Sequence, residues 1–100
     1  MRYAIILSPE AVEDLEHFKA NLRASVRDAI ETHLRHAPTK VSKSRIKRLR
    51  GLNRPQYRLR IDDISVYYDV IETSVEIVAI ISKSESADWP ARVGEKERNR

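Results

Sequence analysis

Residues 57–70 read YRLRIDDISVYYDV, and this stretch is the clearest indication of the fold in the sequence. Its first five residues alternate strictly, as in a β-strand with one buried face, so Arg58 and Arg60 share one face while the apolar residues take the other. Asp62-Asp63 is typical of a tight hairpin turn. The apolar run after this turn is therefore predicted to form the second strand of a hairpin.

Further strands flank this hairpin. Residues 75–81 (VEIVAII) are apolar on both faces, which is typical of a central strand, and a turn at residues 72–74 joins them to the hairpin. Residues 45–49 are predicted as an edge strand, followed by a turn at residues 51–55. The β-branched run at residues 2–7 (RYAIIL) is predicted as the first strand.

Two helices are predicted between the first strand and the edge strand. Ser8 can cap the first helix and Pro9 fits its first position. Its apolar stripe consists of Val12, Leu15, Phe18 and Leu22. A second helix is expected after a break near residues 21–25, ending at Ala37-Pro38. Its apolar face consists of Val26, Ala29, Ile30, His33 and Leu34.

These elements predict an α+β fold in which a small, mostly antiparallel sheet is packed by an N-terminal pair of helices, in the order β-α-α-β-β-β-β. A chain of 100 residues is usually one domain. We expect that domain to cover residues 1–89 and a polar C-terminal tail to cover residues 90–100.

Composition excludes several classes of site. The chain has no cysteine, which excludes disulfides, thiolate metal sites and cysteine nucleophiles and suits a reducing cytoplasm. His17, His33 and His36 lack the close spacing of metal ligands, so neither a metal nor another cofactor is expected. No apolar run approaches the roughly 20 residues that span a bilayer, so no membrane association is expected.

Positive charge is concentrated in one segment. The net charge is +4, yet nine cations and no acid lie between Pro38 and Arg60, which leaves ten basic and fifteen acidic residues elsewhere, a net charge of −5. Such clustering creates a field that attracts a polyanion. The predicted RNA-binding residues are Lys43, Arg45, Lys47, Arg48, Arg54 and Tyr57. Single-stranded RNA is favoured over duplex DNA because the cations lie on strands and loops rather than on a recognition helix.

Two other interpretations of this basic segment stay open. Lysine and arginine protect edge strands from aggregation. A basic surface also docks an acidic protein partner.

A basic face of this kind can supply the positive charge that RNA cleavage needs. Cleavage by the neighbouring 2′-hydroxyl requires removal of its proton, neutralisation of the phosphorane and delivery of a proton to the leaving oxygen. Arg50, Arg58 and Arg60 are the candidates for neutralising charge, because arginine binds phosphate bidentately. Tyr67, Lys83 and Glu85 are the candidates for proton transfer. Tyr68, which alternates with apolar neighbours, is expected in the core.

Several phrases together resemble one family. SPEAVEDL at residues 8–15, IKRLRGL at residues 46–52, YRLRIDDISVYYDV and the final strand followed by KSE are similar to the RelE/ParE superfamily of bacterial type II toxins. The resemblance covers roughly residues 2–89. It implies a RelE-like, microbial-RNase-type fold, an antitoxin that wraps the toxin and, in the RelE branch, cleavage of messenger RNA on the ribosome. Arg50, Arg58 and Arg60 match basic residues of that branch.

Three positions depart from the RelE pattern. An arginine of the family falls on Ser65 here, another falls near Ser84, and the C-terminal tyrosine has no match, Trp89 being the nearest aromatic residue. Alternatives to messenger-RNA cleavage therefore stay open. One is a non-enzymatic ParE-like toxin that inhibits DNA gyrase. Another is a module that only binds its antitoxin and reaches operator DNA through that complex.

Overall fold

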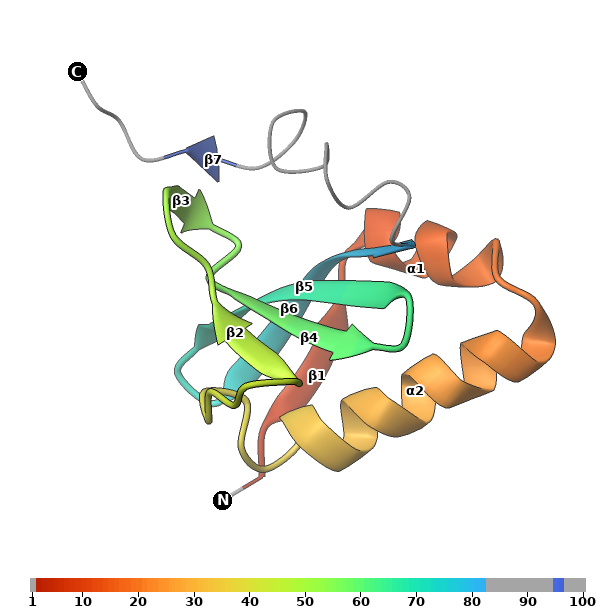
Figure 1. Ribbon diagram of the computed structural model, residues 1–100, viewed down its shortest axis with the longest axis horizontal. Helices are drawn as coiled ribbons and strands as arrows, with labels where there is room; N and C mark the ends of the chain where they lie inside the picture. Colours follow the sequence, from red (N-terminus) through yellow and green to blue (C-terminus); the bar gives the residue numbers. More distant parts are fainter. Residues whose placement is uncertain (1, 83–94, 97–100) are drawn as a thin grey trace.

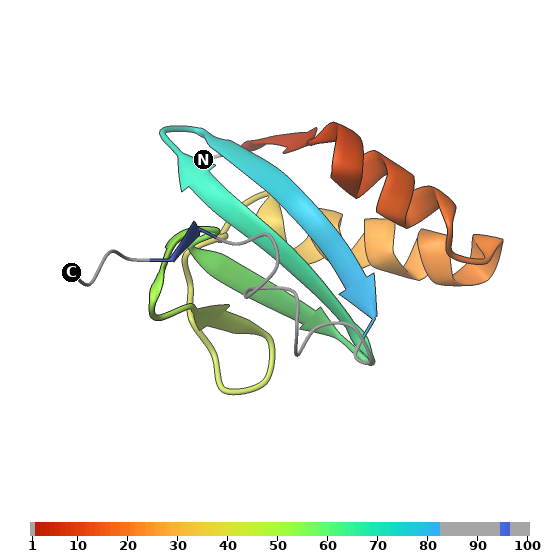
Figure 2. The ribbon, with the colours of Figure 1, turned by 90° about the horizontal axis from the view of Figure 1, so that it is seen from above.

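The computed structural model describes residues 2–82 and 95–96. The elements in chain order are β1 (Ala4–Leu7), α1 (Pro9–Glu16), α2 (Ala20–Leu34), β2 (Ile46–Arg48), β3 (Leu52–Arg54), β4 (Tyr57–Ile61), β5 (Ile64–Ile71), β6 (Ser74–Ser82) and β7 (Glu95–Lys96). The two helices cover one face of a five-stranded sheet, and the chain reverses direction between them (Figures 1 and 2). This confirms the predicted α+β fold.

The strands of the main sheet lie in the order β1-β6-β5-β4-β2. β1 runs parallel to β6, and every other neighbouring pair is antiparallel. The predicted order β-α-α-β-β-β-β is therefore correct for this sheet, with β2 at one edge and β6 in the interior. Its two hairpin turns hold residues at positive φ, Asp62 at 51° and Glu72 at 55°.

A second, two-stranded sheet was not predicted. β3 pairs with β7 in antiparallel fashion, and Leu52 lies opposite Lys96. The prediction of a plain turn over residues 51–55 is therefore wrong, because a partner far along the chain turns part of that segment into a strand. β7 lies within the segment that we expected to be a polar tail.

The start of α1 follows the prediction, and its end does not. Ser8 Oγ accepts a hydrogen bond from the Ala11 amide at 3.0 Å, as a helix cap does. The helix ends at Glu16, and α2 begins at Ala20, so the predicted break near residues 21–25 is placed too late. Lys19 is extended at the junction, and Arg23 Nη1 donates to the Phe18 carbonyl at 3.1 Å. These contacts fix the earlier break.

The core lies between the helices and the sheet. From α2 it receives Val26, Ile30 and Leu34, as predicted. From α1 it receives Ala11 and Leu15, whereas Val12, predicted in the apolar stripe, is 42% exposed. Because α1 ends at Glu16, the apolar surface that it packs on the core is shorter than that of one continuous helix through Leu22 would be. Neither helix in the described part of the chain is long and apolar enough to cross a membrane.

Candidate functional site

We call the sheet face opposite the helices the open face, and strand register fixes which side chains share it. Arg58 on β4 lies between Lys47 on β2 and Tyr67 on β5 in one cross-strand row. Arg60 and Ser65 form the next row. Tyr57, Leu59 and Ile61 point to the helices instead and pack on the core. The predicted placement of Arg58 and Arg60 on one face is therefore confirmed.

Arg58 is the most constrained cation of the open face. Its side chain is half buried, and its Nε is the one buried side-chain nitrogen or oxygen within the described residues that has no hydrogen-bond partner. Burial lowers the pKa of the Arg58 guanidinium, and the charge of Arg60 lowers it further, while Tyr67 acts in the opposite direction. A buried N–H group without an acceptor is rare, and an anionic ligand would satisfy it.

Tyr67 forms the apolar part of the open face. It is only 3% exposed and clusters with Ala79 and Ile81, while Leu49 and Val78 pack against this group. A bulge in the β5–β6 pairing between Tyr67 and Tyr68 locally breaks the regular register. The phenol of Tyr67 thus stands in an apolar setting across the strand pair from the Arg58 guanidinium.

Two predicted RNA-binding residues lie on the helix side of the sheet. Tyr57 stacks on Tyr68 with ring centroids 5.5 Å apart, and the Arg48 guanidinium lies 5.3 Å above the Tyr57 ring. Arg48 also donates to the Gln56 carbonyl at 3.0 Å. Arg48 and Tyr57 are therefore separated by the thickness of the sheet from Arg58.

Arg54, another predicted RNA-binding residue, is engaged by acids. Its Nε donates to Asp69 Oδ2 at 2.9 Å, and its Nη2 lies 3.6 Å from Glu76 Oε1. Asp69 is 2% exposed and also accepts a hydrogen bond from the Gln56 amide at 2.7 Å. This buried carboxylate was missed in the sequence, although an acid inside an otherwise apolar strand is a signal of a specific partner.

The remaining predicted cations lie in loops around β2. Lys43 and Arg45 are exposed before this strand, and Arg50 is exposed after it, next to Gly51 at φ 76°. The Arg45 carbonyl accepts the Arg60 amide at 2.8 Å, which fixes this loop to β4. Lys83 and Glu85, predicted for proton transfer, lie outside the described residues.

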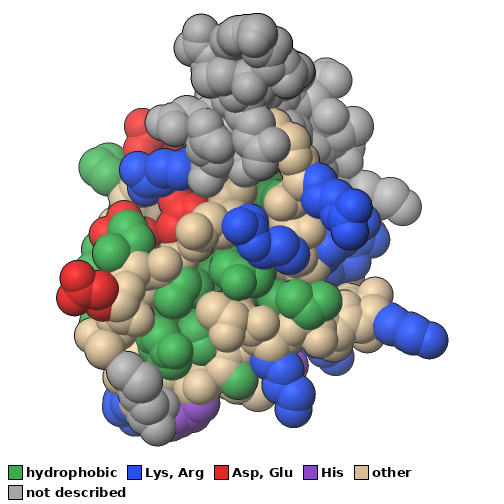
Figure 3. Space-filling view, turned by 90° about the vertical axis from the view of Figure 1, so that its left-hand side faces the viewer, with side chains coloured by type: hydrophobic (Ala, Val, Ile, Leu, Met, Phe, Trp, Pro, Cys, Tyr) green, Lys and Arg blue, Asp and Glu red, His purple; other side chains and the backbone are tan. Residues whose placement is uncertain are grey.

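The charged side chains are unevenly distributed over the surface. Seen from the left of Figure 1, Asp and Glu lie only at the left of the view, with Lys or Arg side chains among them, whereas most Lys and Arg side chains lie at the centre, the right and the lower edge (Figure 3). Such a distribution favours polyanion binding at the basic side. Within the described residues no three His, Asp or Glu side chains are grouped as metal ligands would be.

Comparison with known proteins assigns the chain to a protein family. A family model described as the ParE toxin of the type II toxin-antitoxin system parDE matches residues 5–87. The chain belongs to the ParE toxin family. It is thus a member of a toxin family of type II toxin–antitoxin systems, and the predicted RelE/ParE resemblance is confirmed. No curated protein sequence matches it.

Solved structures of RelE toxins share the fold of this ParE-family chain. The RelB–RelE antitoxin–toxin complex from Methanococcus jannaschii is 20% identical with a TM-score of 0.65, over 84% of this chain and 96% of that chain. The RelBE2 complex from Mycobacterium tuberculosis is also 20% identical with a TM-score of 0.63, over 82% and 99%. A mutant of the free Escherichia coli toxin RelE is 17% identical with a TM-score of 0.68, over 91% and 93%.

One departure from the RelE pattern falls inside the open face of this ParE-family protein. Ser65, where the resemblance predicts an arginine, is 3% exposed and lies directly across from Arg60. A small hydroxyl therefore stands where a third strand-borne cation would be. Ser84 and Trp89, the other two departures, lie outside the described residues.

Proposed function

We propose that this toxin is a ribosome-dependent endoribonuclease that cleaves messenger RNA and so inhibits translation. The observation that supports this most is the setting of Arg58, which is half buried, has an unpartnered Nε and lies beside Arg60. A phosphodiester supplies both the negative charge and the hydrogen-bond acceptor that this guanidinium lacks. The open face is thus organised for an anion before any ligand arrives.

The chemistry assigned to this face is transfer of phosphorus to the neighbouring 2′-oxygen. A bond forms between the 2′-oxygen and phosphorus, and the bond from phosphorus to the 5′-oxygen breaks, which leaves a cyclic phosphate and a 5′-hydroxyl. Arg58 and Arg60 neutralise the charge that develops on the non-bridging oxygens. Arg50, in the exposed loop beside the face, is the third candidate for this role.

Proton transfer needs separate groups. One proton leaves the 2′-hydroxyl and another is delivered to the 5′-oxygen. Tyr67 is the candidate on the open face, because it lies directly across from Arg58 in the same cross-strand row. Lys83 and Glu85 remain the other two candidates.

The test is cleavage of messenger RNA in a translating extract, mapped by its new 5′ ends. Arg58→Gln and Arg60→Gln should each slow cleavage on the order of a hundredfold to a thousandfold, the usual cost of losing one charge-stabilising donor. Lys19→Gln and Arg27→Gln are matched controls, because both residues are exposed cations on the helical side of the fold, Lys19 just before α2 and Arg27 within it. Intact messenger RNA with the wild-type protein would refute the proposal.

The expected partner of the toxin is an antitoxin. The two RelE complexes named above each pair the toxin with an antitoxin. The uneven charge distribution on this chain favours an antitoxin segment in which acidic residues cover the basic side and apolar residues fill the neighbouring surface (Figure 3). Reversing two cations, as in Arg58→Glu with Arg60→Glu, should therefore weaken antitoxin binding as well as ribosome binding.

A second candidate function is inhibition of DNA gyrase without RNA chemistry. The match to the ParE family favours it, and so does Ser65 in place of an arginine. A supercoiling assay separates the two functions. Relaxed plasmid together with uncut messenger RNA would favour gyrase inhibition, whereas supercoiled plasmid with cut messenger RNA would favour the endoribonuclease.

A further inference from the structure

A small pocket lies on the helix side of edge strand β2, away from the open face. Its volume is about 210 Å³, and its lining comes from the end of α2, the loop that follows and the start of β2. The lining includes His33, Ala37, Lys40, Ser42, Arg45 and Ile46. Ligand pockets for drug-sized molecules begin at roughly 300 Å³, so this one fits a single base or side chain.

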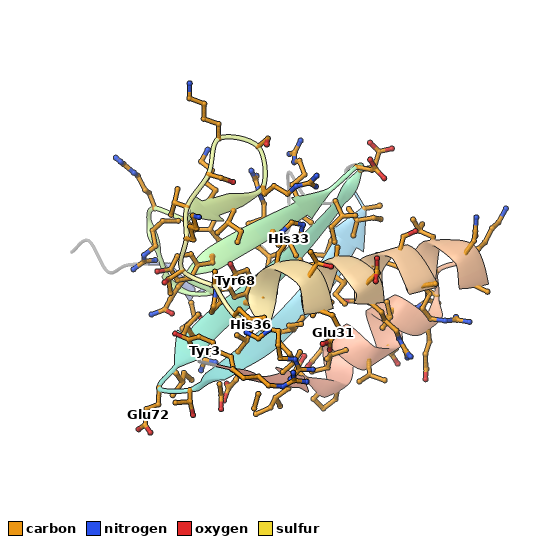
Figure 4. All side chains as sticks on the ribbon, turned by 90° about the horizontal axis from the view of Figure 1, so that it is seen from below. Tyr3, Glu31, His33, His36, Tyr68 and Glu72 are labelled. Atoms are coloured by element: carbon orange, nitrogen blue, oxygen red, sulfur yellow. The ribbon has the colours of Figure 1, made fainter. Side chains whose placement is uncertain are left out.

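The pocket combines an apolar floor with a cationic rim. Ile46 is buried, and the partly buried ring of His33 lies on the side of α2 that faces the β2–β4 edge of the sheet (Figure 4). Lys40 and Arg45 are exposed at the rim, and none of the lining residues is acidic. An aromatic ring and apolar floor suit a nucleobase, while two cations suit its phosphate.

The loop that forms the rim is held by hydrogen bonds. Ser42 Oγ accepts the amides of Arg45 at 3.1 Å and Ile46 at 3.2 Å, and the Ser42 amide donates to the Ile46 carbonyl at 2.9 Å. These bonds use the lone pairs of the Ser42 hydroxyl, so its O–H is left to donate to a ligand. The rim is therefore ordered before a ligand binds, which lowers the entropy cost of binding.

The helix end determines where an anion sits in this pocket. The last carbonyls of α2 carry a partial negative charge of about half an electron, so a phosphate is disfavoured against the helix itself. It is favoured at the outer rim, between Lys40 and Arg45. The base then points inward to His33 and Ile46.

The pocket and the open face lie on two sides of one edge. The Arg45 carbonyl accepts the Arg60 amide at 2.8 Å, and the next residues of β2 place Ile46 on the helix side and Lys47 on the open face. We infer that the pocket binds one nucleotide of a single-stranded RNA that passes from the open face over β2. The inference rests on the proposed function, because it extends the path of the same RNA.

The test is binding of labelled single-stranded RNAs of increasing length, followed by fluorescence anisotropy at low salt. The affinity of the wild-type protein should step up once an RNA is long enough to cross β2. Lys40→Ala with Arg45→Ala should remove this step and reduce the salt slope for long RNAs by about 0.7 for each phosphate that no longer binds a cation. His33→Ala should weaken binding of long RNAs by about fivefold to a hundredfold, the range for one stacked base.

The controls separate this site from general charge and from folding. Lys19→Ala with Arg27→Ala removes two exposed cations elsewhere and should keep the step in affinity. Circular dichroism and thermal melting check that each variant is folded. The inference is overturned if both double variants show the same length profile. It is also overturned if only the affinity for an acidic peptide falls, since the pocket would then bind protein. Absence of RNA binding at every length would refute the proposed function itself.

Discussion

Replacing Tyr68 by phenylalanine should destabilise the toxin at neutral pH and stop doing so in alkali. Tyr68 is fully buried, and its hydroxyl donates to the Pro38 carbonyl at 2.6 Å. Tyr68→Phe keeps the ring and its stacking on Tyr57 but leaves that carbonyl without its donor. The expected loss in the free energy of unfolding is about 1–2 kcal/mol. For a domain of this size it corresponds to a fall in Tm of roughly 4–16 °C.

The alkaline behaviour follows from the pKa of the same phenol. Burial raises the pKa of Tyr68 above its usual value, and the neighbouring Tyr57 raises it further. The folded state therefore holds the proton more tightly than the unfolded chain, where the pKa is about 10. The resulting stabilisation is complete below about pH 10 and falls by about 1.4 kcal/mol per pH unit above it. Wild type and Tyr68→Phe should become equally stable near pH 11.

Urea unfolding followed by far-UV circular dichroism between pH 7 and about pH 11 measures this difference. Subtracting the free energy of unfolding of the variant from that of the wild type cancels the contributions of the titrating groups that the two proteins share. Tyr3→Phe is the matched control, because the Tyr3 phenol makes no hydrogen bond with the described part of the chain. A difference between wild type and Tyr68→Phe that stays constant up to pH 11 would refute the assigned burial and hydrogen bond.

Two further predictions concern single contacts. Ser8→Ala should lower the free energy of unfolding by about 1–2 kcal/mol in chemical denaturation, because Ser8 both caps α1 and donates to the Val78 carbonyl at 3.0 Å; Ser8→Thr, which keeps the hydroxyl, should recover most of it. Asp69→Asn should cost about 2 kcal/mol in the same assay, since an amide replaces the buried carboxylate that holds Arg54 and the Gln56 amide; an unchanged midpoint would show that the carboxylate does not anchor this segment.

The sequence predicts those helix and turn boundaries that depend on a few adjacent residues. Ser8 and Pro9 set the start of α1, and Asp62-Asp63 set the β4–β5 turn, because caps and tight turns depend on a few adjacent residues. The break between the helices depends instead on Arg23 reaching the Phe18 carbonyl, which helical periodicity does not encode. The apolar periodicity continues through this junction, so it predicts a break later in the chain than the observed one.

Long-range pairs were the part of the site that the sequence did not predict. Asp69 receives Arg54 and the Gln56 amide, from residues 15 and 13 positions earlier in the chain. Charge alone groups Arg54 with the RNA-binding cations, because its acidic partner lies outside the acid-free segment. The buried acid in β5 was the available signal. It indicated that a nearby cation would be used for structure.

Because side chains alternate along a strand, the cations of the basic segment are divided between the two faces of the sheet. The total charge of the segment does not show this division. Neighbours in β2 point in opposite directions, so Lys47 joins Arg58 and Arg60 on the open face while Arg48 lies over Tyr57 on the helix side. A ligand confined to the open face therefore meets only part of the nine cations counted in the sequence. The salt dependence of RNA binding measures this directly, because its slope counts the phosphates neutralised on one path. A slope that requires more cations than the open face holds would mean that the RNA crosses β2.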